Sequence, residues 1–583
     1  MTGTGPASLV PKVARALWWL AATVTVWPFG FAAIRSEDLW WHLAAGEWML
    51  RQRAIPLVDP FSFTAAGKPW LNDAWLADLI FAIWSRAFGL ETLAWWKWGV
   101  VVATFLVLMR TCRRLADDDP GSAYLAVVLA AAVAEPFLDL RPQLYSFLGL
   151  ALVLELALGR ERPSLLTPVL FLVWANLHAG FLFGLGALAI VLLPRVLWGP
   201  GSARIRAGAV AALSTAACLA NPNGLRVFTR PVAYALDATS PFRQLMEWRP
   251  PFQPGGAESA AYPYAIAVFA AAAVLAIALP ATRRREATWI AIALGGVSLA
   301  MSLTSRRFVP LFAMTQALVL APVLRRISTP LTDALPSLLA PAVAATVGVA
   351  WLAPYPLSSF AFHYLTVEDS FPVETCHFIE ANGLGGNVFA QYGWAGYVSY
   401  RTGGRLQVYI DGRADAVYDG ALYARYNAVA YGQNEWFEIL RDSGAEYMLW
   451  PRYGTWRRLP TALVANGSWR RLYEDAVSIL LVRADRAPPG ALRSAPDSAW
   501  HDYALGVFAI EQGNPRDAEH HLEQALARAP YLRNACDQLA HARVLAGDDV
   551  GGRETIARCQ RIFPMRGRME WFQGISAAGP HRP

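Results

Sequence analysis

The chain has 583 residues, of which 55% are hydrophobic and only 16% are charged, and it contains 24 tryptophans. Soluble domains carry about 25% charged residues, so this composition excludes an ordinary soluble protein and predicts an integral membrane protein. The formal net charge of +7 does not indicate a nucleic-acid partner. Nearly all lysines and arginines lie in short clusters between apolar segments, which is typical of membrane topology signals.

Apolar segments long enough to cross a bilayer, about 17 to 25 residues when helical, recur along the first 352 residues. The first segment is not expected to be a cleaved signal peptide, because it lacks a small-residue cleavage site and leads into further spans. We predict about eleven transmembrane helices. They occupy the windows 14–34, 93–110, 121–138, 142–158, 165–178, 180–198, 207–220, 262–280, 288–303, 308–322 and 333–352.

Basic clusters occur in every second connection between these windows, which predicts a cytoplasmic amino terminus. The segment 73–89 is interpreted as a helix in the outer interface, because counting it as a span would place the cluster around Arg110 outside. Residues after 353 are then extracytoplasmic, which in a bacterial cell means an inner-membrane protein with a periplasmic carboxyl-terminal part. The basic clusters are Lys12 and Arg15; Arg110, Arg113 and Arg114; Arg160 and Arg162; Arg195, Arg204 and Arg206; Arg283, Arg284 and Arg285; and Arg325 and Arg326.

Polar residues lie against the span ends on the predicted outer side. Polar groups at membrane depth are costly unless they pair or line a wet cavity. Their recurrence on one side therefore predicts a single outward-facing site. The loops concerned are 35–72, 135–143, 175–180, 221–231 continuing to 247–251, and 305–308.

From residue 353 to 490, short apolar strands alternate with helical patterns, which predicts a compact extracytoplasmic α/β domain. The expected helices are Val373–Asn382 and Tyr423–Ser443, and the expected strands lie in NVFAQY, RLQVYIDGR, AEYMLW and VSILLVR. The stretch DGRAD, residues 411–415, follows a strand and is either an Asp-Arg turn or a binding site. Because Asp-Gly is ordinary turn chemistry, the turn is the preferred interpretation.

Residues 496–570 resemble two tetratricopeptide repeats. Gly513 and Gly547 are 34 residues apart, as are Pro530 and Pro564, and this is the period of such repeats. The second unit is degenerate, with Gly552 where a small helix-packing alanine is usual. Three or more repeats normally make a stable array, so we expect this helical tail to pack on the preceding domain or on a protein partner. The first unit matches at Leu505, Gly506, Ala518, Leu522, Ala525 and Pro530.

The five cysteines show no CxxC spacing and thus no metal or redox motif. Cys536 and Cys559 could pair in an oxidising compartment, although two unpaired helix-packing cysteines are the preferred interpretation. No cluster of histidine and cysteine predicts zinc. The outer carboxylates could hold a divalent cation, but their spacing alone does not show one, so the cofactor stays unknown.

Carboxylates and arginines in an outward cavity suit a reaction between a membrane-borne phosphate and an external hydroxyl. The planar donor fork of arginine can hold two phosphate oxygens, and a carboxylate can accept the hydroxyl proton as the oxygen attacks. A polyprenyl phosphate leaves as a stable anion. Such a transfer needs a base and positive charge more than a general acid.

The stretch SEDLWWHLAAGEW, residues 36–48, places an acidic pair directly after the first span and before a juxtamembrane helix, a second surface helix and many spans. This arrangement over residues 1–352, with the outer loop 35–92, resembles the GT-C superfamily of membrane glycosyltransferases, which includes aminoarabinose transferases, protein O-mannosyltransferases and oligosaccharyltransferases. The resemblance implies a polyprenyl-phosphate sugar donor, inversion at the anomeric centre and a catalytic aspartate at Asp38, with Glu37 as its neighbour. The stretches RPQLYSFLGLAL, SRRFVPLFA and YIDGRAD also look like those of bacterial multispanning proteins without a settled activity.

Each candidate in the first outer loop has a simpler alternative. Asp38 could cap a helix beginning at Leu39, since aspartate is a preferred cap residue, and one residue can be both cap and base. His42 is a candidate substrate ligand that could merely face the membrane interface. The neighbouring tryptophans are expected to be interface anchors, although tryptophan also stacks on sugar rings. These are Trp40, Trp41 and Trp48.

The later loops supply the other candidate substrate-binding residues. Glu135 and Asp139 flank Pro136 at a span end, where a second acidic site often lies in GT-C proteins, but Asp139 could simply pair with Arg141. His178 could be a structural, hydrogen-bonded histidine as easily as a site residue.

Two further groups complete the candidates. Arg306 and Arg307 have no obvious acidic neighbour in the sequence, so a lipid phosphate is a reasonable partner, with headgroup contact at the rim as the alternative. Asp59 and Asp73 are expected to be turn and helix-start residues.

The sequence thus favours a multispanning α-helical membrane protein with an extracytoplasmic α/β domain and a short tetratricopeptide-like tail. Its predicted function is transfer of a sugar from a polyprenyl-phosphate donor to an extracytoplasmic acceptor hydroxyl. The predicted partners are this donor, membrane lipids and a protein bound at 496–570, without nucleic acid. The rival hypothesis is a non-catalytic scaffold, or a transport or assembly component of an envelope polysaccharide or protein-modification system.

Overall fold

The computed structural model describes residues 9–30, 34, 36–160, 162–236, 240, 245–253, 259–332, 338–353, 370–433, 435–488 and 490–562. Some predicted features therefore lie outside the described residues: Arg35, positions 354–369 of the expected α/β domain, and positions 563–570 of the tail with Pro564. The chain divides into two compact units. The first unit comprises Met1–Phe31, Asp73–Ala77 and Leu93–Tyr355, and the second comprises Ala32–Asn72, Asp78–Thr92 and Pro356–Pro583.

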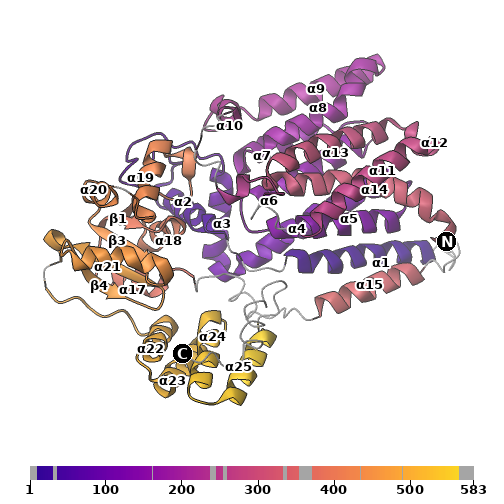
Figure 1. Ribbon diagram of the computed structural model, residues 1–583. Helices are drawn as coiled ribbons and strands as arrows, with labels where there is room; N and C mark the ends of the chain where they lie inside the picture. The colour runs from indigo at the N-terminus through magenta and orange to yellow at the C-terminus, as the bar shows by residue number, and fades with distance from the viewer. Residues whose placement is uncertain are drawn as a thin grey trace. The chain divides into compact units, whose positions relative to one another are not determined.

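The first unit is built from helices and loops in its described part (Figure 1). Its amino-terminal half contains α1 (Leu9–Val26), η2 (Trp27–Gly30), α4 (Leu93–Leu115), α5 (Pro120–Ala134), η4 (Glu135–Phe137), α6 (Gln143–Val153), the π-helical turn η5 (Leu154–Leu158), α7 (Thr167–Leu177), α8 (Phe181–Trp198) and α9 (Gly201–Ala217). Its remaining elements are α10 (Arg226–Leu236), η7 (Met246–Trp248), α11 (Tyr262–Ala278), α12 (Pro280–Arg283), α13 (Glu286–Thr304), η8 (Arg306–Phe308), α14 (Val309–Thr332) and α15 (Leu339–Leu352).

A helix occupies each of the eleven predicted membrane windows. Among the described residues, five helical segments are long and apolar enough to cross a bilayer: Leu90–Leu115, Pro120–Phe137, Phe181–Trp198, Glu286–Thr304 and Arg306–Ile327. The chain is therefore a multi-pass membrane protein, and the larger total of about eleven spans stays a prediction.

The second unit combines the first outer loop with the carboxyl-terminal part of the chain. The outer loop contributes α2 (Asp38–Gln52), most of α3 (Trp75–Phe88) and η3 (Leu90–Thr92). The α/β domain contains α17 (Val373–Ala381), β1 (Gly386–Ala390), α18 (Tyr392–Thr402), β2 (Leu406–Val408), η9 (Ala414–Ala416), α19 (Gly420–Ala430), α20 (Trp436–Arg441), β3 (Tyr447–Pro451), η10 (Gly454–Arg457), α21 (Arg458–Ala465), β4 (Trp469–Glu474), β5 (Ser478–Arg483) and η11 (Ala484–Arg486).

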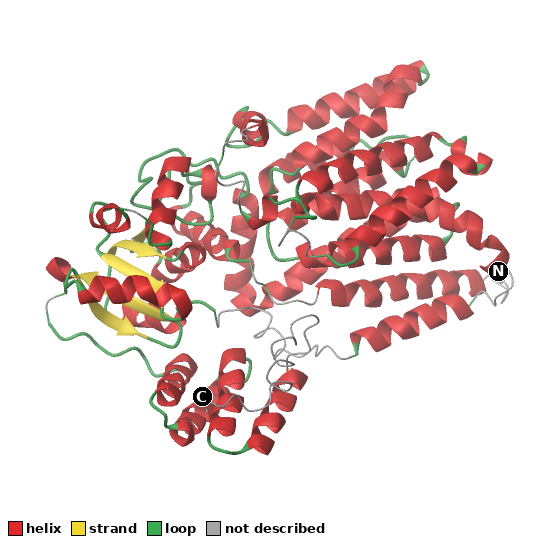
Figure 2. Cartoon of the chain, viewed as in Figure 1, coloured by secondary structure: helices red, strands yellow, loops and turns green. Residues whose placement is uncertain are grey.

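The strands of the α/β domain lie together as one sheet, drawn in yellow in Figure 2. The sheet has five strands in the order β2-β1-β3-β5-β4. Strand β1 is parallel to β2 and β3, whereas β5 is antiparallel to β3 and β4. The four predicted strands correspond to β1, β2, β3 and β5. The fifth, β4, was not predicted because WRRLYE is largely polar, as expected for an edge strand. Helix α18 was also missed, since its two glycines break the hydrophobic period.

Helix α2 of the outer loop packs on α18 of the α/β domain. A Cβ atom at Gly396 would lie 3.0 Å from the backbone nitrogen of Trp41, so the missing side chain lets the two helices approach closely. Trp40 is 2% exposed, and its ring lies edge-on to Tyr397 at 4.7 Å. The expectation that Trp40 anchors the membrane interface is wrong, because this helix face is covered by the α/β domain.

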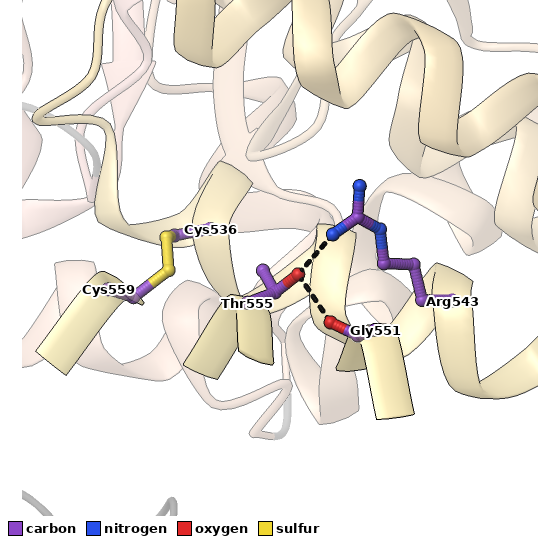
Figure 3. Close-up of a disulfide and its surroundings, with 5 residues drawn as sticks. All are labelled: Cys536, Arg543, Gly551, Thr555 and Cys559. Carbon is purple, nitrogen blue, oxygen red and sulfur yellow. Dashed lines mark hydrogen bonds between the residues drawn. A yellow bond between two sulfur atoms is a disulfide. The ribbon is translucent and has the colours of Figure 1, made fainter. Parts of the chain in front are cut away.

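The tail forms two helical hairpins, α22 (Ala499–Glu511) with α23 (Pro515–Arg528) and α24 (Arg533–Leu545) with α25 (Asp549–Ile562). A Cβ atom at Gly506 would lie 2.5 Å from Leu522 Cγ, so glycine permits the close packing of α22 on α23. Helices α24 and α25 are joined by a disulfide between Cys536 and Cys559 (Figure 3). The preferred interpretation of two unpaired cysteines is therefore wrong, because the second hairpin brings both sulfurs together.

The tail packs on the α/β domain, one of the two packing modes predicted for it. His501 of α22 contacts Glu374 of α17, with 2.7 Å between Nδ1 and Oε1. Arg452, after β3, donates from both terminal nitrogens to Glu511 of α22 and from Nε to Glu474 of β4. Charged side chains on α17 and directly after β3 thus hold α22, the first tail helix, on the α/β domain.

Candidate functional site

The acidic pair of the first outer loop lies at the start of α2. The helix begins at Asp38 itself, while the cap position belongs to Glu37, which makes no side-chain capping hydrogen bond. Asp38 already has helical backbone geometry, so the alternative that it caps a helix beginning at Leu39 is wrong. Its carboxylate instead accepts a hydrogen bond from Trp41 Nε1 at 3.2 Å.

Two glycines let the backbone of the α/β domain approach these carboxylates. A Cβ atom at Gly393 of α18 would overlap the carboxylate of Glu37, and one at Gly412 would lie 2.6 Å from Asp38 Oδ1. Tyr392 is close enough to Asp38 that burial, helped by this carboxylate and Asp411, raises the pKa of the phenol well above its ordinary value. The α/β domain therefore completes the surroundings of the proposed base.

His42 does not face the membrane interface, and that alternative is wrong. It is 4% exposed, and its Nδ1 lies 2.5 Å from Oδ1 of Asp78 on α3. The second oxygen of Asp78 accepts from Asn72 at 2.7 Å. Burial raises the pKa of Asp78, although His42 and Asn72 oppose the shift. These contacts let His42 fix α2 to α3, and its role as a substrate ligand stays a prediction.

The DGRAD stretch forms a buried ion-pair centre. Arg413 is 2% exposed and lies between Asp59 and Asp411, at 2.5 and 2.8 Å. Burial alone would lower the pKa of Arg413, but Asp411, Tyr418 and Asp59 raise it well above its ordinary value. Asp59 also accepts from the backbone nitrogens of the turn that follows it, as predicted. The arrangement is that of the structural Asp-Arg turn.

The first unit contains a separate arginine cluster around Glu247. Arg141 Nη1 donates to Glu247 Oε2 at 2.7 Å, and Arg307 Nη1 lies 3.5 Å from Glu247 Oε1. The guanidinium of Arg307 also stacks on Trp248 at 4.1 Å. The backbone nitrogen of Arg306 donates to the carbonyl of Arg249. These residues come from three segments that are distant in the sequence: the turn before α6, the loop before α11 and the turn before α14.

These contacts correct one expectation. Arg306 and Arg307 do have an acidic neighbour, Glu247, which the sequence placed about sixty residues away in a polar outer loop. Arg141 pairs with this glutamate, and Asp139 lies 3.9 Å from Lys97 Nζ. The expected pairing between Asp139 and Arg141 stays a prediction. The only signal for Glu247 was its place in the stretch EWRPP among the outer loops.

His178 and Glu135 complete the predicted set in this unit. His178 Nδ1 accepts from the backbone nitrogen of Gly180 and contacts the hydroxyl of Ser146, at 3.1 and 2.7 Å. These bonds favour the structural alternative for His178. Glu135 is half-buried at the first position of η4.

Asp38, Glu37 and His42 thus belong to the second unit, and the remaining candidates belong to the first. Within the described ranges, no group of three or more histidine, cysteine, aspartate or glutamate side chains is arranged to hold a metal ion.

No protein-family model matches the chain, and no curated protein sequence matches it. Solved structures do. The oligosaccharyltransferase of Archaeoglobus fulgidus in its apo form matches with a TM-score of 0.53 and 13% identity over 75% of this chain and 69% of that chain. The oligosaccharyltransferase AglB of the same organism, in complex with an inhibitory peptide and a dolichol-phosphate, gives 0.55 and 12% over 91% and 85%.

A third structure, the Archaeoglobus fulgidus enzyme tethered to an acceptor peptide containing the NVT sequon, gives a TM-score of 0.54 and 12% identity over 92% of this chain and 86% of that chain. At these identities the likeness establishes the fold. The chain has the fold of the Archaeoglobus fulgidus oligosaccharyltransferase, and the predicted resemblance to oligosaccharyltransferases is confirmed at the level of the fold.

Proposed function

We propose that this chain, which shares the fold of oligosaccharyltransferases, is a glycosyltransferase that moves a sugar from a polyprenyl-phosphate donor to an extracytoplasmic acceptor hydroxyl. The observation that carries the proposal is the fold match over nine-tenths of the chain, which includes both the membrane unit and the α/β domain. One matching structure is bound to a dolichol-phosphate, a donor-like lipid. Fold alone does not define chemistry, so the roles below rest on the residues themselves.

Asp38 is the proposed base. It would take the proton of the acceptor hydroxyl while the hydroxyl oxygen forms a bond to the anomeric carbon. The bond from that carbon to the phosphate oxygen breaks in the same step, and its electron pair leaves with the polyprenyl phosphate. A single displacement of this kind inverts the anomeric centre. Trp41 holds one carboxylate oxygen. Glu37 and Glu135 are proposed to accept hydrogen bonds from the hydroxyl groups of the substrates.

The departing phosphate needs positive charge, and Arg141, Arg306 and Arg307 are proposed to supply it. Guanidinium groups bind phosphate oxygens through paired, charge-assisted hydrogen bonds. The present contacts of Arg141 and Arg307 with the carboxylate of Glu247 support the ability of this cluster to bind an oxyanion. Asp139, in the loop of Arg141, is proposed to contact the substrate, whereas His178 is given a structural role by its bonds to Ser146 and Gly180.

We further propose an inner-membrane protein with about eleven spans and a periplasmic α/β domain and tail. The disulfide between Cys536 and Cys559 supports this side for the tail, because disulfides persist in oxidising compartments such as the periplasm.

The alternative function is a scaffold or an assembly component. The two helical hairpins of the tail favour it, because tetratricopeptide-like hairpins commonly form docking surfaces for proteins. In that case the protein partner would bind within residues 496–570.

The test is transfer of sugar from a polyprenyl-phosphate donor by the full chain in liposomes. Asp38→Asn keeps an acceptor for Trp41 Nε1 but cannot take a proton, so the rate should fall by roughly 10²- to 10⁴-fold with unchanged folding. Asp419→Asn is the matched control. Asp419 caps α19 in the same unit, asparagine retains capping, and transfer should be unaffected. Full activity in a folded Asp38→Asn protein would contradict the proposed base.

A further inference from the structure

The carboxylate of Glu247 binds Arg141 and Arg307, two of the arginines that the proposed function assigns to the donor phosphate. We infer that Glu247 is an internal stand-in for the donor phosphate: its carboxylate occupies the arginine cluster until a phosphate group displaces it. The inference rests on the proposed function for the identity of the ligand, and on the contacts of Glu247 for the site.

The two oxygens of Glu247 engage two different arginines. Oε2 accepts from Arg141 at 2.7 Å and Oε1 lies 3.5 Å from Arg307. Arg141 lies two residues before the start of α6, and Arg307 belongs to η8. A single carboxylate therefore bridges two separate segments of the chain. Phosphate oxygens would make the same pair of charge-assisted contacts.

The arginine cluster has supports that do not depend on the Glu247 carboxylate. Arg307 is held by the ring of Trp248 at 4.1 Å. The Glu247 backbone is fixed separately, because its carbonyl accepts from Ser305 Oγ at 3.0 Å. Removing the carboxylate from the arginines therefore requires rotation of one side chain and leaves the loop in place.

The exposure of Arg141 and Glu247 allows a phosphate group to replace the carboxylate. The side chains of Arg141 and Glu247 are 34% and 35% exposed, so an anion can reach the pair from solvent or from the lipid headgroup layer. Buried ion pairs in the second unit, such as Arg413 with Asp59 at 0% exposure, offer no such access. The Glu247 cluster is thus built as an exchangeable site.

The charge state also fits competition between anions. Burial acts to raise the pKa of Glu247, but Arg307, Arg141 and Arg306 outweigh it and lower that pKa below its ordinary value. The carboxylate is therefore ionised at neutral pH and occupies the arginines as an anion. A phosphate group offers more acceptor oxygens than a carboxylate. Its charge is about one in the donor diester and up to about two in the polyprenyl phosphate that leaves, which favours it in exchange for a carboxylate.

The test measures phosphate binding directly on the full chain in nanodiscs, with inorganic phosphate in one arm and a polyprenyl phosphate in the other. Glu247→Gln keeps the side-chain shape and removes the competing charge. We expect its Kd for the phosphate probe to fall by about 10-fold, the effect of losing one charge-assisted contact. Glu286→Gln removes a carboxylate from the start of α13 in the same unit and should leave Kd unchanged.

The two arms identify the source of the ligand. A lower Kd for both probes means that the phosphate group itself is recognised, and a lower Kd for the lipid alone means that the polyprenyl chain is also required. Either result supports the inference. An unchanged or higher Kd for both probes in Glu247→Gln overturns it. If that variant does not fold, Glu247→Asp replaces it, because the shorter side chain withdraws the charge from the arginines; a Kd equal to that of the unmodified chain then overturns the inference.

These outcomes are separate from the failure of the proposed function. Tighter phosphate binding in Glu247→Gln without sugar transfer by the unmodified chain would contradict the transferase while keeping the stand-in. Sugar transfer by the unmodified chain, with unchanged phosphate binding in Glu247→Gln, would support the transferase and contradict the role of Glu247 as a stand-in.

Discussion

His42 and Asp78 form a buried pair that joins α2 to α3, with 2.5 Å between Nδ1 and Oδ1. Asp38 lies one turn before His42 on the same helix, and Trp41 connects them: its indole donates to Asp38, and its ring lies 3.5 Å from the imidazole. The proposed base is therefore fixed through a short series of side chains that ends in a buried carboxylate. Perturbing any member should change the position of Asp38.

Gly46→Ala tests the contact between α2 and α3. A Cβ atom there would overlap the carbonyl oxygen of Asp78 and lie 2.6 Å from Ala82 Cβ, so the helices must separate. We expect a loss of about 1–3 kcal/mol in the free energy of unfolding, measured by denaturation in detergent. Gly208→Ala is the control, because a Cβ atom on that helical glycine meets nothing within 4 Å. Equal stability of the two variants would contradict the close approach.

Trp41→Phe removes the indole donor to Asp38 and keeps an aromatic ring against His42. A hydrogen bond to a charged group is worth roughly 1.5–3 kcal/mol, so the maximal transfer rate should fall about 10-fold or more. KM for the donor should stay within about twofold, because the arginines that bind phosphate are untouched. A rise in KM without loss of rate would show that Trp41 contacts the substrate instead of positioning the base.

Arg413→Ala should destabilise the second unit strongly. Removing this side chain leaves Asp59 and Asp411, both fully buried, without their cation, and breaking a buried pair in this way costs about 3–5 kcal/mol. Arg441→Ala is the matched control, because its pair with Asp442 is more than half exposed on both sides. Thermal unfolding of the two variants should differ clearly, and similar melting temperatures would contradict a structural role for the DGRAD turn.

The contact between the tail and the α/β domain should depend on pH. Burial raises the pKa of Glu374 from 4.5 to about 7, and repulsion from Asp475 adds to this, while Tyr473 and His501 oppose it. The folded chain holds the proton more tightly than the unfolded chain, so this group contributes stability below pH 4.5 that is lost as the pH rises through about 7. The loss amounts to about 3 kcal/mol.

Glu374→Gln resembles the protonated carboxyl and checks this expectation. Its melting temperature should fall less than that of the unmodified chain between about pH 5 and pH 8. Parallel pH profiles for the two proteins would exclude Glu374 as the group responsible.

The disulfide between Cys536 and Cys559 leads to one prediction about the stability of the second tail hairpin and one about the cellular compartment of the tail. Closing a loop of 23 residues with a disulfide stabilises a fold by about 3 kcal/mol, so Cys536→Ser should unfold the second hairpin at a lower temperature. In cells, thiol labelling of the denatured chain should modify Cys536 and Cys559 only after reduction, whereas Cys112, Cys218 and Cys376 are free thiols. Labelling of all five cysteines without a reductant would contradict a periplasmic tail.

The sequence alone determined the features that depend on local patterns. Hydropathy over about 20 residues marked the positions of the apolar helices of the first unit, and alternation of apolar residues marked β1, β2, β3 and β5. The 34-residue spacing from Gly513 to Gly547 marked the two hairpins of the tail, where both glycines end a helix with positive φ. These patterns suffice because each element forms within its own stretch of the chain.

Only the tertiary structure decided which polar groups meet. Glu247 lies 106 residues from Arg141, and Asp59 lies 354 residues from Arg413, so no local period connects them. The same is true of His42, whose partner depends on a glycine that lets a second helix approach. A charged side chain that must be buried requires a partner of opposite charge, but the sequence does not say which one. That choice is made when the helices pack.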